Sequence, residues 1–92
     1  MQRKKLNFRR DIMKAVISVI GKDRVGILAM ICNECASANI NILDVAQTIV
    51  DGMFTMTMSV DFTMMNGSLI DFTKHMETLG KEKNLVIHVM HQ

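Results

Sequence analysis

The chain has 92 residues, which is enough for one domain and too few for two. Only 4% of the residues are aromatic, all of them Phe, so there is little surface on which nucleic-acid bases could stack. The formal charge of +2 is unevenly divided: residues 1–12 carry five basic side chains and one acidic one, whereas residues 13–92 carry six basic and eight acidic ones, a net charge of −2. A mildly acidic body argues against direct binding of nucleic acid, which needs clustered Lys and Arg.

The chain shows no signal for export or for membrane insertion. No apolar run approaches the roughly 20 residues of a membrane span, and no apolar segment follows the basic N-terminal residues. Two cysteines without an export signal favour free thiols in a reducing compartment. We therefore expect a cytoplasmic protein that does not contact membranes.

The first twelve residues, MQRKKLNFRRDI, have the composition of a disordered basic leader. Met13 is a candidate for the natural start, because a purine-rich ribosome-binding sequence can encode the Arg9-Arg10 pair two codons before it. An ordinary basic arm or an added, non-native extension explains these residues equally well. The expected division is a leader over residues 1–12 and one domain over residues 13–92.

The segment from Ala15 to Ile20 is rich in β-branched residues, and we expect a strand buried on both faces that ends at Gly21. A helix should follow, with Asp23 as its N-cap and Asn39 at its C-terminus, because Asn tolerates a left-handed backbone conformation. The predicted apolar stripe of this helix is Leu28, Ile31, Cys35 and Ala38.

The next segments predict a β-hairpin. Residues 40–50 form a second strand, and the adjacent apolar residues Ile42 and Leu43 indicate a bulge or burial on two sides. Asp51-Gly52 is a typical two-residue hairpin turn. The third strand alternates cleanly, and its apolar side consists of Phe54, Met56, Met58 and Val60.

A second helix should start at Ser68, because Ser68 and Asp71 form a variant of the capping box, and Gly80 should stop it. Its predicted apolar stripe is Leu69, Phe72, Met76 and Leu79. Residues 85–90 form the last strand. The order β-α-β-β-α-β with right-handed crossovers predicts an α+β, ferredoxin-like fold: a four-stranded antiparallel sheet with both helices on one face.

Cys32 and Cys35 form a C-x-x-C pair, which a metal carrier or redox protein could use. The pair lies within the predicted helix rather than before it, and only Cys35 falls on the apolar stripe. His88 and His91 should face opposite sides of the last strand, and His75 lies on the second helix. Two ordinary helix cysteines are therefore the favoured interpretation, and no metal site or cofactor is predicted.

The turn from Lys22 to Gly26 is more informative, because it places charged side chains beside the N-terminus of a helix. Free backbone N–H groups there suit a carboxylate or a phosphate, and Arg24 could pair with such an anion. A solvated turn whose Asp caps the helix is the simpler alternative. The sequence contains no nucleophile triad, P-loop, dinucleotide motif or carboxylate pair, so no catalytic residue is predicted.

This turn also carries a family resemblance. The stretch Val19–Ala29, VIGKDRVGILA, continued by Asn39–Asp44, NINILD, resembles the ACT domain. The similarity is greatest to small stand-alone ACT proteins related to the glycine cleavage system transcriptional repressor. It extends from Met13 to about His91, and similar proteins continue for a few residues beyond the last strand.

The resemblance implies a regulatory domain that binds a small molecule, commonly an amino acid, and modulates a separate partner protein. The implied ligand lies near the first strand–helix turn, often between two copies, so a homodimer is expected. Carried over by position, the implied ligand-binding residues are Asp23, Arg24, Val25, Gly26 and Ile27, with Asn39, Asn41 and Asp44 as neighbours. Asp23 or Asp44 would accept from the ligand's ammonium group.

Three alternatives accompany this hypothesis. The chain could be a protein–protein interaction module without a ligand, or a metal carrier that uses Cys32 and Cys35. It could also resemble acylphosphatases, which share the topology and use an Arg in the first turn and an Asn on the second strand, here Arg24 and Asn41. Asp23 would repel an acyl phosphate, and the flanking pattern differs from that family, so we expect no enzyme.

Overall fold

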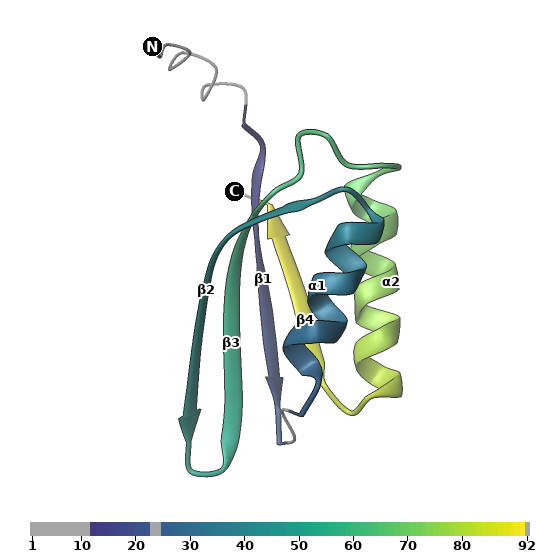
Figure 1. Ribbon diagram of the computed structural model, residues 1–92. Coiled ribbons are helices and arrows are strands. Elements are labelled where there is room, and N and C mark those ends of the chain that lie inside the picture. Colours follow the sequence, from purple (N-terminus) through teal and green to yellow (C-terminus); the bar gives the residue numbers. More distant parts are fainter. Residues whose placement is uncertain (1–11, 23–24, 92) are drawn as a thin grey trace, which may run out of the picture.

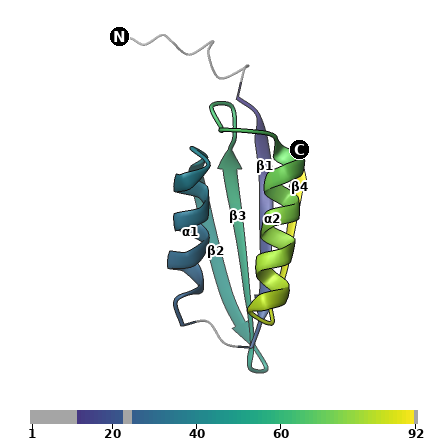
Figure 2. The same ribbon diagram turned by 90° about the vertical axis from the view of Figure 1, so that its right-hand side faces the viewer.

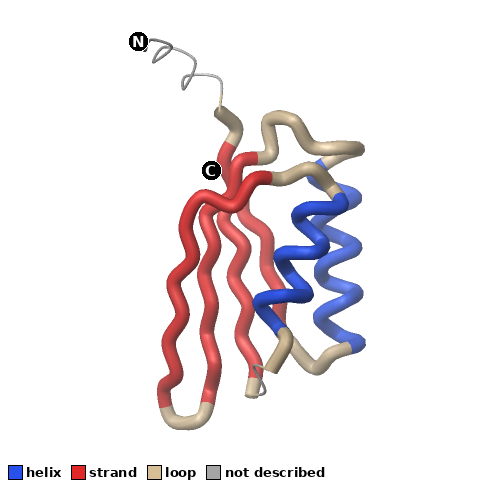
Figure 3. Tube along the Cα trace, in the orientation of Figure 1, coloured by secondary structure: helices blue, strands red, loops and turns tan. Residues whose placement is uncertain are grey.

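The computed structural model describes residues 12–22 and 25–91. The elements follow the order β1 (Lys14–Gly21), α1 (Ile27–Ser37), β2 (Asn41–Val50), β3 (Met53–Asp61), α2 (Leu69–Glu82) and β4 (Val86–His91). The strands form one antiparallel sheet in the order β2-β3-β1-β4 (Figure 1). Figure 2 shows both helices in front of the same face of the sheet, and Figure 3 shows the two resulting layers. The predicted ferredoxin-like βαββαβ fold is confirmed.

The central strand β1 is buried on one face only. Ala15, Ile17 and Val19 are fully buried beneath the helices, whereas Ile20 on the opposite face is 38% exposed. The prediction that this strand is buried on both faces is therefore wrong. The physical reason is that both helices lie on one side, so no second layer covers the other face.

The β2–β3 hairpin has the predicted geometry. Asp51 and Gly52 both have positive φ, 53° and 79°, as a type I′ turn requires. The pairing register shifts between Ile42 and Asp44, which confirms the predicted bulge. β3 buries its four predicted apolar residues, with the alternate positions less buried.

α1 begins later than the sequence indicated. Gly26, with φ 78°, occupies the N-cap position and has no side chain with which to cap the helix, so the assignment of the N-cap to Asp23 is wrong. Because the helix starts at Ile27, its buried stripe is Ile27, Ile31 and Cys35, whereas Leu28 is 36% exposed. Asn39 adopts a left-handed φ of 59° just after the helix, as predicted.

α2 starts as predicted and ends later. The Oγ atom of Ser68 accepts a hydrogen bond from the backbone N–H of Asp71 at 3.1 Å. The helix continues past Gly80 to Glu82, so the prediction that Gly80 stops it is wrong. Gly80 is instead a buried packing position, where a Cβ atom would lie 2.8 Å from the carbonyl oxygen of Leu85. The left-handed residue that follows the helix is Asn84, with φ 59°.

Candidate functional site

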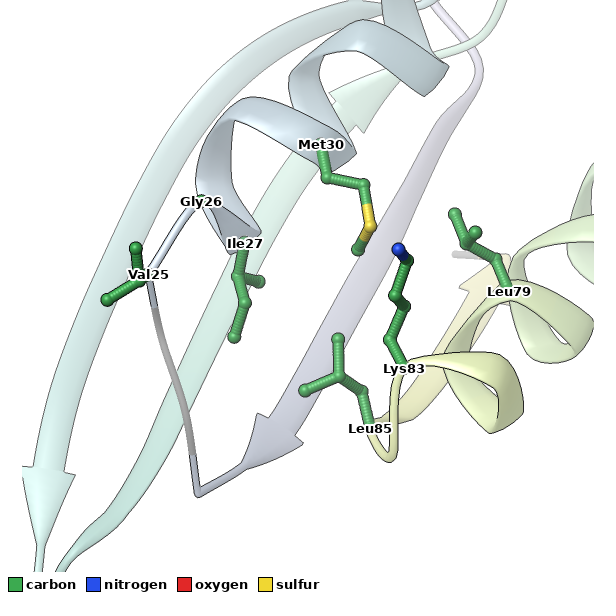
Figure 4. Close-up of a pocket in the computed structure, with 7 residues that line it drawn as sticks. All are labelled: Val25, Gly26, Ile27, Met30, Leu79, Lys83 and Leu85. Atoms are coloured by element: carbon green, nitrogen blue, oxygen red, sulfur yellow. The ribbon is translucent and has the colours of Figure 1, made fainter.

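A pocket of about 360 Å³ lies between the N-terminus of α1 and the C-terminal end of α2 (Figure 4). One wall comes from the β1–α1 turn and the first turn of α1, and the other from α2 and the α2–β4 connection. Its lining residues are Val25, Gly26, Ile27, Met30, Leu79, Lys83 and Leu85. The pocket forms here because the antiparallel topology brings the β1–α1 and α2–β4 connections to the same end of the sheet.

The α1 wall combines an apolar surface with the positive end of a helix. Gly26 turns the chain into the helix, and its carbonyl oxygen accepts the first helical hydrogen bond, from Met30 N–H at 2.9 Å. The N–H groups of the first turn have no partner within the helix, and neither a side chain of the N-cap Gly26 nor an acidic residue in this turn offsets their partial charge. Ile27 anchors the wall, since it is only 5% exposed.

The α2 wall supplies the charge of the pocket. The backbone N–H of Lys83 donates to the carbonyl oxygens of Leu79 and Gly80, both at 3.1 Å, and Leu85 N–H donates to Gly80 at 2.8 Å. These bonds fix the end of the helix, and the Lys83 side chain extends toward Met30 and Leu79 (Figure 4). No ion pair of Lys83 occurs within residues 12–22 and 25–91.

Sequence reasoning missed all four lining residues beyond the turn: Met30, Leu79, Lys83 and Leu85. Leu79 was assigned only to the core, where it is half-buried rather than enclosed. The available signal was topological, because in the predicted βαββαβ fold an antiparallel pairing of the first and last strands brings the start of the first helix near the end of the second.

The structure separates the predicted ligand-binding residues into two groups within one chain. Val25, Gly26 and Ile27 line the pocket, whereas Asp23 and Arg24 lie outside the described residues. Asn39, Asn41 and Asp44 lie at the opposite end of the sheet, because the 11-residue α1, about 16 Å long, runs between the groups.

The second group also has local contacts of its own. Asn39 Nδ2 donates to the carbonyl oxygen of Met64 at 2.9 Å, which ties the end of α1 to the β3–α2 loop. Asp44 pairs in register with Ser59, and both therefore face away from the helices. The separation also places Asn41 far from the β1–α1 turn, so one chain does not join the two residues that the acylphosphatase alternative needs.

The cysteines differ in environment as predicted. Cys35 is buried in the core, and this burial, with smaller contributions from Cys32 and Glu34, raises the pKa of its thiol from 9.0 to about 11. Cys32 is half-buried. A protonated, enclosed thiol is a poor nucleophile and a poor metal ligand. In the described part of the chain, no group of three or more His, Cys, Asp or Glu residues could hold a metal ion.

The histidines lie apart from one another. His75 Nε2 lies 2.7 Å from Glu34 Oε1, a contact that joins the exposed surfaces of the two helices. The rings of His91 and Phe62 meet edge to face, with centroids 5.2 Å apart, on the helix side of the sheet. His88 lies on the other face, as the alternation of β4 predicted.

Comparison with known proteins agrees with this architecture. The ACT domain family matches the chain over residues 14–90. The chain belongs to the ACT domain family. It is 42% identical to a UPF0237 protein of Listeria innocua, covering 87% of this chain and 90% of that protein. A UPF0237 protein of Methanosarcina mazei is 43% identical, covering 84% of each chain.

Solved structures of other proteins share the fold of this chain. An ACT domain protein from Streptococcus pneumoniae is 33% identical, with a TM-score of 0.77 over 86% of this chain and 89% of that one. A putative glycine cleavage system transcriptional repressor is 24% identical, with a TM-score of 0.70 over 88% of this chain and 46% of that one, and shares the fold. The resemblance stated from the sequence is confirmed.

The family indicates a regulatory domain, because an ACT domain is generally a regulatory, ligand-binding unit. The two relatives described above are one bacterial and one archaeal protein. Within the part of the chain that the structure describes, neither helix is long and apolar enough to cross a membrane.

Proposed function

We propose that this ACT domain binds an amino acid at the β1–α1 turn and thereby modulates a separate partner protein in metabolic or transcriptional regulation. The observation that carries the proposal is the pocket at this turn, where the positive end of α1 meets an apolar wall. A ligand carboxylate would accept from the N–H groups of the first turn of α1. We place this activity in the cytoplasm, where the free thiols of Cys32 and Cys35 would stay reduced.

The ammonium group of an amino acid needs an acceptor. Asp23 precedes the pocket-lining residues in the sequence and is the first candidate. Asp44 is the second candidate, but within one chain it lies at the other end of the sheet. A contribution from Asp44 therefore requires a second copy of the protein.

A homodimer through β2 would bring the two groups of predicted residues together. β2 is an edge strand, and every residue in it except Ile42 is exposed, including Leu43, Val45 and Ile49. An unpaired, apolar edge of this length favours pairing with another strand. In a two-fold symmetric antiparallel pair, the start of one β2 lies toward the end of the other, near the partner's β1–α1 turn. The ligand would then bind between the copies.

A second candidate function, an interaction module without a ligand, is favoured by the open face of the sheet. Ile20 and Val86 are paired in register on this face and are 38% and 64% exposed. The pair of Val16 and Met90 lies four residues along the same strands, beyond the pair of Ser18 and His88. Exposed apolar residues gathered on one face of a sheet are typical of protein interfaces.

A thermal-shift screen of residues 13–92 against each proteinogenic amino acid tests the proposal. A ligand at about 100 times its Kd stabilises the folded state by about 2.7 kcal/mol, which is a readily measured increase in Tm. We expect Asp23→Ala or Arg24→Ala to abolish the shift. If no amino acid raises the Tm of the folded protein, the sensor function is refuted, and partner capture would test the interaction module.

A further inference from the structure

We propose that the pocket selects amino acids with an aliphatic side chain and that Lys83 binds the ligand carboxylate. This inference rests on the proposed function, and it adds to the site a class of ligand and Lys83, the residue that follows α2. Its basis is the set of described side chains that line the pocket, which are apolar except for that of Lys83.

The size of the pocket limits the ligand to a small molecule. At about 360 Å³, it lies at the lower end of the range of roughly 300–1,000 Å³ that ligand pockets occupy. A single amino acid fits such a volume, whereas a nucleotide or a dinucleotide would extend far outside it. The mouth lies beside Val25, which is 88% exposed.

The walls favour an aliphatic side chain. Ile27 and Leu85 are 5% and 8% exposed and form the floor, and Met30 and Leu79 are half-buried on either side (Figure 4). Apart from Lys83, the described lining side chains carry no strong hydrogen-bond donor or acceptor. A polar ligand side chain would therefore gain little from the lining side chains, whereas an aliphatic one would bury apolar surface against four of them.

The charge of the pocket favours an anionic group beside Lys83. Among the lining residues that the structure describes, none is Asp or Glu and Lys83 carries the one charged side chain. Backbone hydrogen bonds from Lys83 to Leu79 and Gly80 hold its Cα atom at the rim of the pocket. A carboxylate between Lys83 and the start of α1 would meet positive charge on both sides.

Isothermal titration calorimetry with leucine, leucinamide and aspartate tests the proposal, using the full chain and two variants. Lys83→Gln removes the proposed carboxylate partner. Lys81→Gln is the matched control, because Lys81 is an exposed residue of the same helix end that does not line the pocket, and the change in net charge is identical. Both substitutions are at exposed positions and should leave the fold intact.

We expect leucine to bind more tightly than aspartate and leucinamide, and Lys83→Gln to raise the Kd for leucine roughly threefold to tenfold, as for a partly exposed charge pair. Lys81→Gln should leave this Kd within about twofold. Equal Kd values for the two variants, or tighter binding of aspartate than of leucine, would overturn the inference while leaving an amino-acid sensor in place. If none of the proteinogenic amino acids binds the unmodified protein, the inference and the sensor function are both refuted.

Discussion

Replacement of Gly80 by Ala separates two opposing effects that the structure assigns to one position. In an ordinary helix the substitution is favourable, because Ala stabilises a helix interior by roughly 0.5–1 kcal/mol relative to Gly. Gly80 lies inside α2 and has no positive φ, so this gain should apply in full.

The packing around Gly80 opposes the gain. A Cβ atom would lie 2.8 Å from the carbonyl oxygen of Leu85 and 3.1 Å from Cγ1 of Ile87. The nearest atom belongs to the backbone and cannot move by rotating a side chain, so α2 and β4 must separate. Overpacking of this kind costs roughly 1–3 kcal/mol, and the separation would also strain the 2.8 Å hydrogen bond from Leu85 N–H to Gly80.

We therefore expect Gly80→Ala to lower the free energy of unfolding by about 1–2 kcal/mol, measured by urea denaturation followed by circular dichroism. In a domain of this size, that corresponds to a decrease in Tm of roughly 4–16 °C. Thr78→Ala is the control, because Thr78 is exposed on the same helix and its replacement should stabilise the protein by a few tenths of a kcal/mol.

The opposite result would refute the reasoning. If Gly80→Ala stabilises the protein as Thr78→Ala does, α2 and β4 do not approach as closely as the structure shows. Gly80 would then be replaceable without cost. If the expected loss occurs, the α2 wall of the pocket should also shift, since Lys83 and Leu85 both donate to the Gly80 carbonyl oxygen.

Three further predictions concern other parts of the chain. Burial holds the pKa of Cys35 at about 11, against 9.0 when the chain is unfolded, so only the unfolded state loses the thiol proton between these two values. The contribution of Cys35 to the free energy of unfolding should therefore be constant below about pH 9 and fall by roughly 2–3 kcal/mol as the pH rises to 11. Cys35→Ala should remove this part of the pH dependence in urea denaturation. Ser68→Ala should lower the free energy of unfolding by about 1 kcal/mol in urea denaturation, and an unchanged midpoint would show that the 3.1 Å bond to Asp71 N–H does not stabilise α2. Val45→Asp, near the middle of the β2 edge, should convert a dimer into a monomer in light scattering with little change in Tm, whereas persistence of the dimer would exclude pairing through β2.

The sequence by itself determined the order of the elements and the features that depend on neighbouring residues. Asp51-Gly52 predicted the hairpin because both residues tolerate positive φ, and the alternation of β3 predicted which of its faces is buried. Ser68 predicted the start of α2 because its hydroxyl reaches a backbone N–H only three residues away. These interactions span a few residues, so the local pattern is sufficient.

Tertiary structure decided whatever depends on contacts between distant segments. Gly80 has the local signature of a helix terminator, but its function in the fold is set by the approach of β4. On α1, Ile31 and Cys35 are buried as predicted, but Ile27 rather than Leu28 is the buried residue ahead of them, because packing against the sheet selects between these two adjacent apolar residues.

The candidate site shows the same division. The β1–α1 turn could be located from its own residues, because a helix N-terminus after a short charged turn is a local feature. Lys83 could not be located in this way, since it is separated from Gly26 by most of the chain. It lines the pocket only because the folded chain brings the end of α2 beside the start of α1. Asn41 and Asp44 are among the first residues of β2, and β2 starts at the end of the sheet opposite the pocket. They therefore cannot line the pocket of their own chain.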